Sequence, residues 1–332
     1  MTAGPPAEKR LPGPADGQAR WAELLGSLLG LLPGGARVLL VDGPAGHARL
    51  FAGRLADEVA AHGTGLRVTT VPGEDADVLV YLRTAPAPGP GQPADPPGSD
   101  RRRRPELADI VVDLHDTSWP VIRRVAAPLA ARGPWYLTET RAFFACRADT
   151  WDAKFGDDGP AYQAAVAEAG LKPGGVAVDV GCGTGRALPP LRAAVGPDGA
   201  VLAVDLTPEM LRAARPAAAA AGAALVLGDA RALPLADRAA DAVFAAGLVN
   251  HLPDSTAGLR ELARVTRPGG LLILFHPTGR AALAARHGHS VSHDEPLAAG
   301  PLRRSAAASG WRLTAYDDAP RRFFAVAERV AG

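Results

Sequence analysis

The chain has little cysteine and almost no net charge, and each of these features excludes whole classes of protein. Its 332 residues include only two cysteines, Cys146 and Cys182, too few for a disulfide framework or a cysteine zinc site. Residues 1–20 lack the apolar stretch of a signal peptide. A formal net charge of +1 argues against a general nucleic-acid or membrane surface. We therefore expect a soluble, cytoplasmic protein without a metal, nucleic-acid or membrane partner.

No uninterrupted apolar run is long enough to span a membrane. The most apolar stretch, residues 24–41, is broken by Pro33-Gly34-Gly35 and by Arg37. Hydrophobic residues still make up 47% of the chain, enough for substantial cores. A chain of this length suggests about two domains. We expect a flexible tail over 1–20, an α/β domain over 21–145, connecting helices over 146–172 and a second α/β domain over 173–332.

The most informative stretch is a glycine-rich turn between a strand and a helix. Residues 176–180 are alternately β-branched and predict a strand, and a helical stretch follows from Arg186. Between them lie Gly181, Gly183 and Gly185, which let a backbone approach a cofactor closely. The spacing is G-x-G-x-G, not the G-x-G-x-x-G of dinucleotide sites. Asp179 would repel a pyrophosphate and favour a cofactor that carries an ammonium and a sulfonium.

The string from Asp179 to Gly185, D-V-G-C-G-T-G, strongly resembles motif I of the Rossmann-like S-adenosylmethionine (SAM) methyltransferases. Further strands follow in the family's order, and the resemblance covers roughly residues 150–330. They are 201–205, 225–229, 241–247 and 271–275, the last after the turn 267–270, with a closing hairpin of 311–316 and 322–330. The resemblance implies an α/β fold of two doubly wound domains, the C-terminal one a seven-stranded sheet with an antiparallel last strand.

The same resemblance implies a SAM site at the carboxyl ends of the first strands. Its expected residues are Asp179, Gly181, Cys182, Gly183, Gly185, Asp205, Leu206, Asp229, Ala230 and Gly247. The spacing of Asp205 from the glycines suits a carboxylate that accepts from ribose hydroxyls. In the family the position of Asp229 accepts from the adenine amino group. Two alternatives stay open: Asp179 and Asp229 as turn residues at strand ends, and Asp205 as the cap of a helix starting near residue 207.

Two histidines are candidates for a base that takes a proton from the methyl acceptor. His251 follows the fourth strand, and an unperturbed histidine titrates near pH ~6.5. Its alternative is a structural histidine at a helix start. His276, after the fifth strand, is the second candidate. Residues 287–293 hold three more histidines, His287, His289 and His293, which we interpret as part of a mobile substrate loop and not as a metal site.

The N-terminal half resembles a uridine-kinase-like domain that has lost its phosphate-binding loop. Strands are expected at 37–42, 66–71, 77–82 and 110–114, with a loop over 86–98 and an exposed arginine run over 101–104. Residues 43–50 have the spacing of a G-x-x-x-x-G-K-[ST] loop. Ala48, Arg49 and Leu50 replace the second glycine, the lysine and the magnesium-binding hydroxyl. We interpret this half as a catalytically dead relic used for packing, substrate presentation or homodimer formation.

An aromatic cluster connects the halves, with Phe143, Phe144, Trp151 and Phe155 at roughly helical spacing. It is either an interdomain helix face or a lid over the SAM site, in which case Trp151, Lys154 and Tyr162 would touch cofactor or substrate. The favoured function is SAM-dependent methylation of a small molecule, with secondary metabolism as a candidate setting. The alternatives are a non-catalytic SAM-binding or regulatory protein and, less favoured, a nucleoside or nucleotide kinase.

Overall fold

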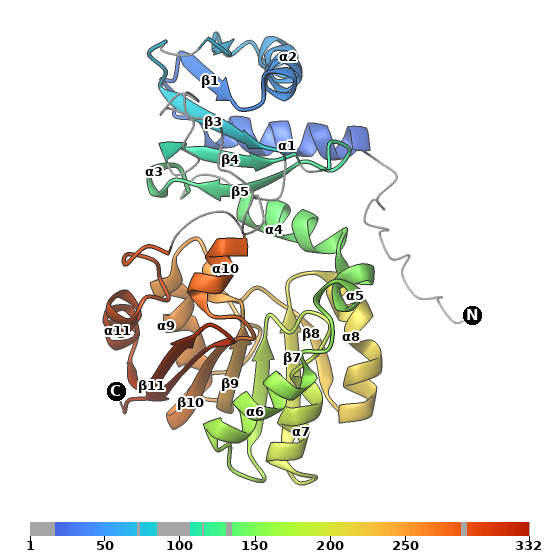
Figure 1. Cartoon of the computed structure of the whole chain (residues 1–332), viewed down its shortest axis with the longest axis vertical. Coiled ribbons are helices and arrows are strands. Elements are labelled where there is room, and N and C mark those ends of the chain that lie inside the picture. Colours follow the sequence, from blue (N-terminus) through green and yellow to red (C-terminus); the bar gives the residue numbers. More distant parts are fainter. Residues whose placement is uncertain are drawn as a thin grey trace, which may run out of the picture. The chain divides into compact units, whose positions relative to one another are not determined.

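The computed structural model describes residues 17–71, 74–84, 107–114, 116–130, 135–286 and 291–331. They form two compact units, one up to Glu139 and one from Thr140 onward (Figure 1). The division lies within helix α4 (Trp135–Ala145), whereas the sequence places it after residue 145. The predicted loop 86–98 and arginine run 101–104 lie outside the described residues.

The first unit is built on a five-stranded sheet with the order β2-β1-β3-β4-β5. Its elements are α1 (Gly17–Leu31), β1 (Val38–Asp42), α2 (Ala45–His62), β2 (Arg67–Thr69), β3 (Val78–Arg83), β4 (Ile110–Asp113), β5 (Val121–Val125) and α3 (Ala127–Ala130). The first four strands are parallel and match the predicted ones, and β5 pairs antiparallel with β4. The sequence missed β5 because Arg123 and Arg124 interrupt its apolar pattern.

Helix α1 corrects the predicted tail, because it begins at Gly17. A stripe of Trp21, Leu24 and Leu28 is buried along this helix. The neighbouring Arg20 is buried too. Its Nε donates to the carbonyl oxygen of Pro120 over 2.8 Å, and its guanidinium pairs with the buried carboxylate of Glu139. Residues 17–20 are therefore anchored in the core of this unit.

The segment that resembles a phosphate loop forms no such loop. Strand β1 ends at Asp42 and α2 begins at Ala45, so Ala48, Arg49 and Leu50 all lie inside the helix. Gly43 makes the tight turn between them with φ +143°, and a Cβ there would lie 2.9 Å from Leu82. Without a second glycine the helix starts early, and no backbone is left to wrap a phosphate.

The buried face of α2 includes Leu55 and Val59, whereas Leu50 is 48% exposed. Phe51 takes its place in the core and lies 5.7 Å, centroid to centroid, from the ring of Trp21. The buried stripe of this helix therefore consists of Ala48, Phe51, Leu55 and Val59.

The second unit is a seven-stranded sheet with the order β11-β12-β10-β9-β6-β7-β8. Its strands are β6 (Val176–Val180), β7 (Ala200–Asp205), β8 (Ala224–Leu227), β9 (Ala240–Ala246), β10 (Thr266–His276), β11 (Trp311–Ala319) and β12 (Arg322–Arg329). The first five are parallel, and β12 lies antiparallel between β10 and β11. This Rossmann-like arrangement with an antiparallel end confirms the predicted fold class.

Helices cover both faces of this sheet (Figure 1). The helical segments of this unit are the last part of α4, then η2 (Ala148–Thr150), α5 (Trp151–Phe155), α6 (Gly159–Ala169), α7 (Leu188–Val195), α8 (Pro208–Ala221), η3 (Val249–His251), α9 (Ser255–Val265), α10 (Arg280–Arg286) and α11 (Ala299–Ala308). Helix α7 packs between α6 and α8, while α9 packs with α11. The core includes Leu188, Phe244 and Ile273, all buried.

The sheet order brings the predicted site residues to one end of the sheet. The carboxyl ends of parallel strands lie at the same end, and β6 has β7 on one side and β9 on the other. The strand order reverses at β6, and open α/β sheets bind ligands outside the strand ends at such a position. The ends carry Asp179, Asp205, Gly228, Gly247 and His276.

Candidate functional site

The glycine loop follows β6 and is held to the end of β7. Gly181, Gly183 and Gly185 have φ of +73°, +53° and +86°, values that residues with side chains rarely adopt. The amides of Gly181 and Cys182 both donate to the carbonyl oxygen of Val204, over 2.8 and 3.0 Å. The loop therefore lies against the neighbouring strand, directly above the sheet edge.

The last two positions of this loop are glycine for different physical reasons. A Cβ on Gly185 would lie 2.9 Å from Leu188 and 3.2 Å from Ala217, so this glycine permits close packing of α7 and α8. A Cβ on Gly183 would meet no heavy atom within 4 Å. Gly183 therefore faces open space, where a bound molecule can approach the backbone.

Two acids lie beneath this loop. Asp205 Oδ2 accepts from the amide of Gly183 over 2.9 Å, and its Oδ1 accepts from the amide of Thr207 over 2.8 Å. Thr207 is the N-cap residue of α8, so Asp205 ties the glycine loop to the start of this helix and is not itself the cap. Burial raises the pKa of Asp205. Leu206, next along the chain, is partly buried.

Asp179 is the more unusual acid, because its side chain is fully enclosed and incompletely paired. The residue is 1% exposed, and Oδ1 has no hydrogen-bond partner among the described residues. Burial, and then the nearby charge of Asp205, raise the pKa of Asp179 to about 8. An unpaired buried carboxylate is costly. A cation bound beside it would relieve that cost.

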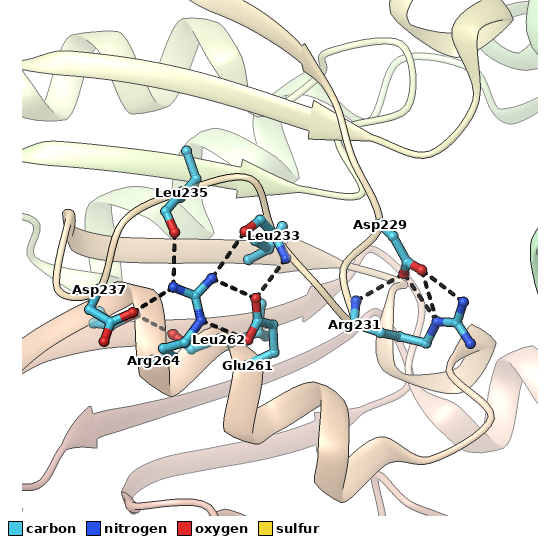
Figure 2. A network of polar contacts seen from close by, with 9 residues as sticks. Asp229, Arg231, Leu233, Leu235, Asp237, Glu261, Leu262 and Arg264 are labelled. Atoms are coloured by element: carbon cyan, nitrogen blue, oxygen red, sulfur yellow. Dashed lines mark hydrogen bonds and ion pairs between the residues drawn. The ribbon is translucent and has the colours of Figure 1, made fainter.

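The acid after β8 is paired within its own loop. Asp229 accepts from the amide of Arg231 over 2.9 Å and forms a bidentate ion pair with its guanidinium, 2.8 Å at the closest (Figure 2). Ala230 between them is buried, and the amide of Gly228 donates to the carbonyl oxygen of Asp205 over 3.0 Å. The ends of β7 and β8 are thus fixed to each other.

The rest of this loop is clamped to α9 by one arginine (Figure 2). Arg264 donates to the carbonyl oxygens of Leu233 and Leu235 and pairs with Asp237 and Glu261, over 2.6 to 3.0 Å. Its position three residues after Glu261 suits a helical ion pair. The loop that carries Asp229 and Ala230 is therefore rigidly supported.

Polar contacts that the sequence did not predict hold α5 against the glycine loop. Thr184 Oγ1 donates to Asp152 over 2.7 Å, and Arg186 pairs with Asp152 and Asp158 over 2.9 and 2.8 Å. These partners are more than 25 residues apart in sequence, and no spacing signal connects them. Of the residues expected to touch a ligand here, Lys154 is exposed on α5.

The aromatic residues that precede β6 in the sequence form two groups. Phe144 lies 5.6 Å from Trp151 and 5.2 Å from His251, centroid to centroid. Tyr162 instead packs on Phe275, 5.0 Å away, and belongs to the core. Burial raises the pKa of Tyr162, and the charge of Asp179 adds to the rise. The side chain of Phe155 lies outside the described residues.

The two candidate bases lie in different surroundings. His251 is in η3, among the rings of Phe143 and Phe144. His276 ends β10 and lines a cavity with an empty volume of about 340 Å³, its open mouth included. The other lining residues are Ala245, Gly247, Leu248, Val249, Asn250, Leu274, Phe275, Thr278, Arg280, Leu283, Leu297 and Phe323. His276 therefore lines this cavity, whereas His251 is not among its lining residues.

The histidines of residues 287–293, the absence of a metal site and the absence of a membrane span can be compared only with the residues that the structure describes. His287 and His289 lie outside them, and His293 is exposed. Within the described part of the chain, no three histidine, cysteine or acidic side chains gather closely enough to hold a metal ion. Nor does any described helix combine the length and apolarity needed to cross a bilayer.

Comparison with known proteins shows what this part of the chain resembles. Residues 178–274 match a methyltransferase domain. A demethylmenaquinone methyltransferase of Roseiflexus castenholzii is 38% identical over 117 residues, which cover 35% of this chain and 49% of that protein. An uncharacterized 37.1 kDa protein in transposon TN4556 of Streptomyces fradiae is 39% identical over 107 residues, 32% of this chain and 31% of that protein. The chain thus spans only about a third to a half of the length of these relatives.

Among solved structures, a SAM-dependent methyltransferase from Aquifex aeolicus is 22% identical, with a TM-score of 0.46. The match covers 55% of this chain and 98% of that one. The second unit of the present chain thus contains a methyltransferase domain, carried on a Rossmann-like sheet.

The residues around the glycine loop fit SAM, the cofactor that the motif at residues 179–185 implies. The unpaired Oδ1 of buried Asp179 is an acceptor for an ammonium, and the open space at Gly183 leaves room for a ligand against the backbone. Both oxygens of Asp205 already accept one backbone N–H, and each can accept one more donor. Gly247, at the end of β9 with φ +68°, borders the same edge.

Proposed function

We propose that the chain transfers a methyl group from SAM to a small-molecule acceptor. The observation that carries the proposal is the unpaired carboxylate of Asp179 under the open position of Gly183, within a matched methyltransferase domain. When bound, SAM supplies a methyl carbon activated by the adjacent sulfonium. What remains for the chain is positioning, which is worth many orders of magnitude in rate.

Each site residue has a distinct part in this proposal. Asp179 would hold the cofactor's ammonium, and Asp205 would accept from its ribose hydroxyls. Asp229 would accept from the adenine amino group, sharing its carboxylate with Arg231. Leu206, Ala230 and Cys182 would line the cofactor. Thr184 and Arg186, through Asp152, would hold α5 close to the glycine loop as a lid.

The acceptor would enter beside the ends of β9 and β10. Leu248 connects the two subsites, since it lines the cavity and its Cδ1 lies 3.2 Å from the Cβ position of Gly181. Biosynthesis of secondary metabolites is a setting in which small acceptors occur.

A direct binding and turnover experiment tests the proposal. SAM and S-adenosylhomocysteine are titrated into the full chain by calorimetry, and radiolabelled methyl transfer is then followed with pooled small-molecule extracts. We expect saturable binding of both ligands and label in a small organic product. Absence of binding would refute the cofactor assignment. Binding without label transfer to any extract would favour the alternative of a non-catalytic SAM-binding or regulatory protein.

A further inference from the structure

Asp229 differs from the other two acids of the proposed cofactor site because a cation is bound to it. Nη2 of Arg231 lies 2.8 Å from its Oδ2. Among the residues that the structure describes, neither Asp179 nor Asp205 takes part in an ion pair, and Asp205 accepts from two backbone amides. The charge of Asp229 is therefore compensated by the chain itself.

Arg231 also takes most of the acceptor capacity of this carboxylate (Figure 2). Oδ1 accepts from the backbone amide of Arg231 over 2.9 Å and from its Nε over 3.1 Å. Oδ2 accepts from Nη2 over 2.8 Å and shares the Nε–H over 3.0 Å. Two carboxylate oxygens offer about four lone-pair positions, and three N–H donors of one residue already use them. The remaining position belongs to Oδ2, because Oδ1 has two donors.

The turn that holds Asp229 and Arg231 together is fixed by its own backbone and by α9. The amide of Ala232 donates to the carbonyl oxygen of Asp229 over 3.0 Å. The next amide, that of Leu233, donates to Glu261 over 2.6 Å. The guanidinium is therefore kept beside the carboxylate by the shape of the turn, and not by the attraction of the two charges alone.

Both side chains of this ion pair are accessible to a ligand. The side chain of Asp229 is 21% exposed and that of Arg231 is 35% exposed. An ion pair as open as this one is weak, so a bound molecule can share the carboxylate. Its hydrogen bond will be weaker than one to an uncompensated carboxylate, because the strength of such a bond follows the charge on the acceptor.

Resting on the proposed function, in which Asp229 accepts from the adenine amino group, we infer that Arg231 determines the specificity of the base subsite. Arg231 competes with the amino group for the carboxylate and so weakens the recognition of that group. The subsite therefore accepts purines with and without a 6-amino group at similar affinity. Specificity for the cofactor then comes mainly from its ribose and its ammonium, at Asp205 and Asp179.

A matched pair of ligands tests this inference. S-adenosylhomocysteine and its 6-deamino analogue, in which a hydrogen atom replaces the amino group, are titrated by calorimetry into the full chain and into Arg231→Ala. We expect the analogue to bind about two- to fivefold more weakly to the unsubstituted chain. In Arg231→Ala the loss should grow to about ten- to hundredfold, the value for a hydrogen bond to a charged acceptor.

Further variants separate competition from other effects. Arg231→Gln keeps most of the side-chain length without the charge and should also increase the preference for the amino group. Arg303→Ala, at an exposed arginine of α11, is the control and should leave the preference unchanged. In the double variant Asp229→Ala/Arg231→Ala the two ligands should bind about equally, because the acceptor itself is gone.

The outcomes distinguish this inference from the proposed function. A preference for the amino group that stays the same or falls in Arg231→Ala would show that Arg231 does not compete for the carboxylate. A preference that survives in the double variant would place the partner of the amino group elsewhere, and either result overturns the inference. Failure of S-adenosylhomocysteine to bind the unsubstituted chain would instead refute the proposed function.

A spectroscopic readout follows the ion pair directly. The Nε–H signal of Arg231, identified by its loss in Arg231→Gln, should shift when S-adenosylhomocysteine is added to the full chain, because the amino group then shares the carboxylate. The 6-deamino analogue should shift this signal less, and the Nε–H signal of Arg264 should move little with either ligand. Equal shifts of the Arg231 signal with both ligands would overturn the inference.

Discussion

The hydroxyl of Thr184 donates a 2.7 Å hydrogen bond to Asp152, which joins the glycine loop to helix α5. Arg186 reinforces this contact by pairing with the same carboxylate over 2.9 Å. Asp152 is largely exposed, at 62% of its side chain, so the pair adds little to global stability. We expect the effect of this pair to be local, on whether α5 stays in place over the glycine loop.

Asp152→Ala should therefore weaken cofactor binding without unfolding the chain. We expect an about two- to tenfold loss of affinity for S-adenosylhomocysteine, the effect of one or two lost hydrogen bonds. Hydrogen exchange over residues 148–158 should become faster. Asp149→Ala, at an exposed acid of η2, is the control. Unchanged affinity and exchange would show that the contact does not hold a lid.

Asp179 should make the chain less stable as the pH rises. An aspartate in the unfolded chain titrates near pH ~3.9, whereas the folded-state pKa of Asp179 is about 8. Between these values the folded state keeps a proton that the unfolded state has lost, so the free energy of unfolding falls with rising pH, by up to about 1.4 kcal/mol per unit.

Asp179→Asn removes this one contribution. Urea unfolding of both proteins between about pH 5 and about pH 8 should show a flatter pH dependence for the variant. It should also show greater stability of the variant at the upper end. Parallel curves for the two proteins would mean that Asp179 is ionised in the folded chain, and that its buried charge has a partner.

Gly183→Ala should reduce cofactor binding while the fold persists. The new methyl group would project into the open space that we assign to the cofactor, at a positive φ that costs about 1 kcal/mol. Gly174 offers a matched control, since it also has a positive φ, of +77°, and open surroundings. Comparable thermal stability of the two variants, with affinity for SAM lost only in Gly183→Ala, is the expected result.

Asp205→Ala should lower both cofactor affinity and stability. A lost hydrogen bond to a charged acceptor is worth roughly 1.5–3 kcal/mol, about ten- to hundredfold in affinity. The same substitution leaves the amides of Gly183 and Thr207 without their acceptor, so the melting temperature should fall as well. Calorimetry with S-adenosylhomocysteine and thermal unfolding measure the two effects. An unchanged dissociation constant would place the ribose elsewhere.

The purified chain should not hydrolyse ATP at any magnesium concentration. Phosphoryl transfer needs a phosphate cradle, a lysine and a metal-binding hydroxyl together, and residues 45–50 are helical from the start. Phosphate release from ATP and magnesium, measured with the full chain and with Arg49→Ala, should remain at background for both. Turnover that disappears in Arg49→Ala would contradict this reading and support the kinase alternative.

The strands and the glycine loop of the second unit could be predicted well because their signals are local. The strand at 176–180, the glycines that follow and the acids at 179, 205 and 229 each come from short stretches of sequence. Alternating or β-branched residues and glycine turns are short-range properties, so their elements hardly depend on the remainder of the chain. Strand order then brought the strand ends to one edge, as the resemblance implied.

The start of α2 and the strand β5 could not be predicted from local sequence patterns. The spacing of residues 43–50 suggested a loop, but the structure extends α2 back to Ala45. Strand β5 was missed because pairing with β4, not its own apolar pattern, makes it a strand. Local propensity is weak where tertiary pairing decides the outcome.

The sequence by itself determined the fold of the second unit and the residues of its glycine loop. Only the tertiary structure decided which polar groups are satisfied and which are left open. Whether Asp179 is unpaired, whether Asp152 reaches Thr184 and which histidine lines the cavity all depend on contacts between segments far apart in the chain. Such contacts leave no periodic signal, because they follow from packing and not from local backbone preference.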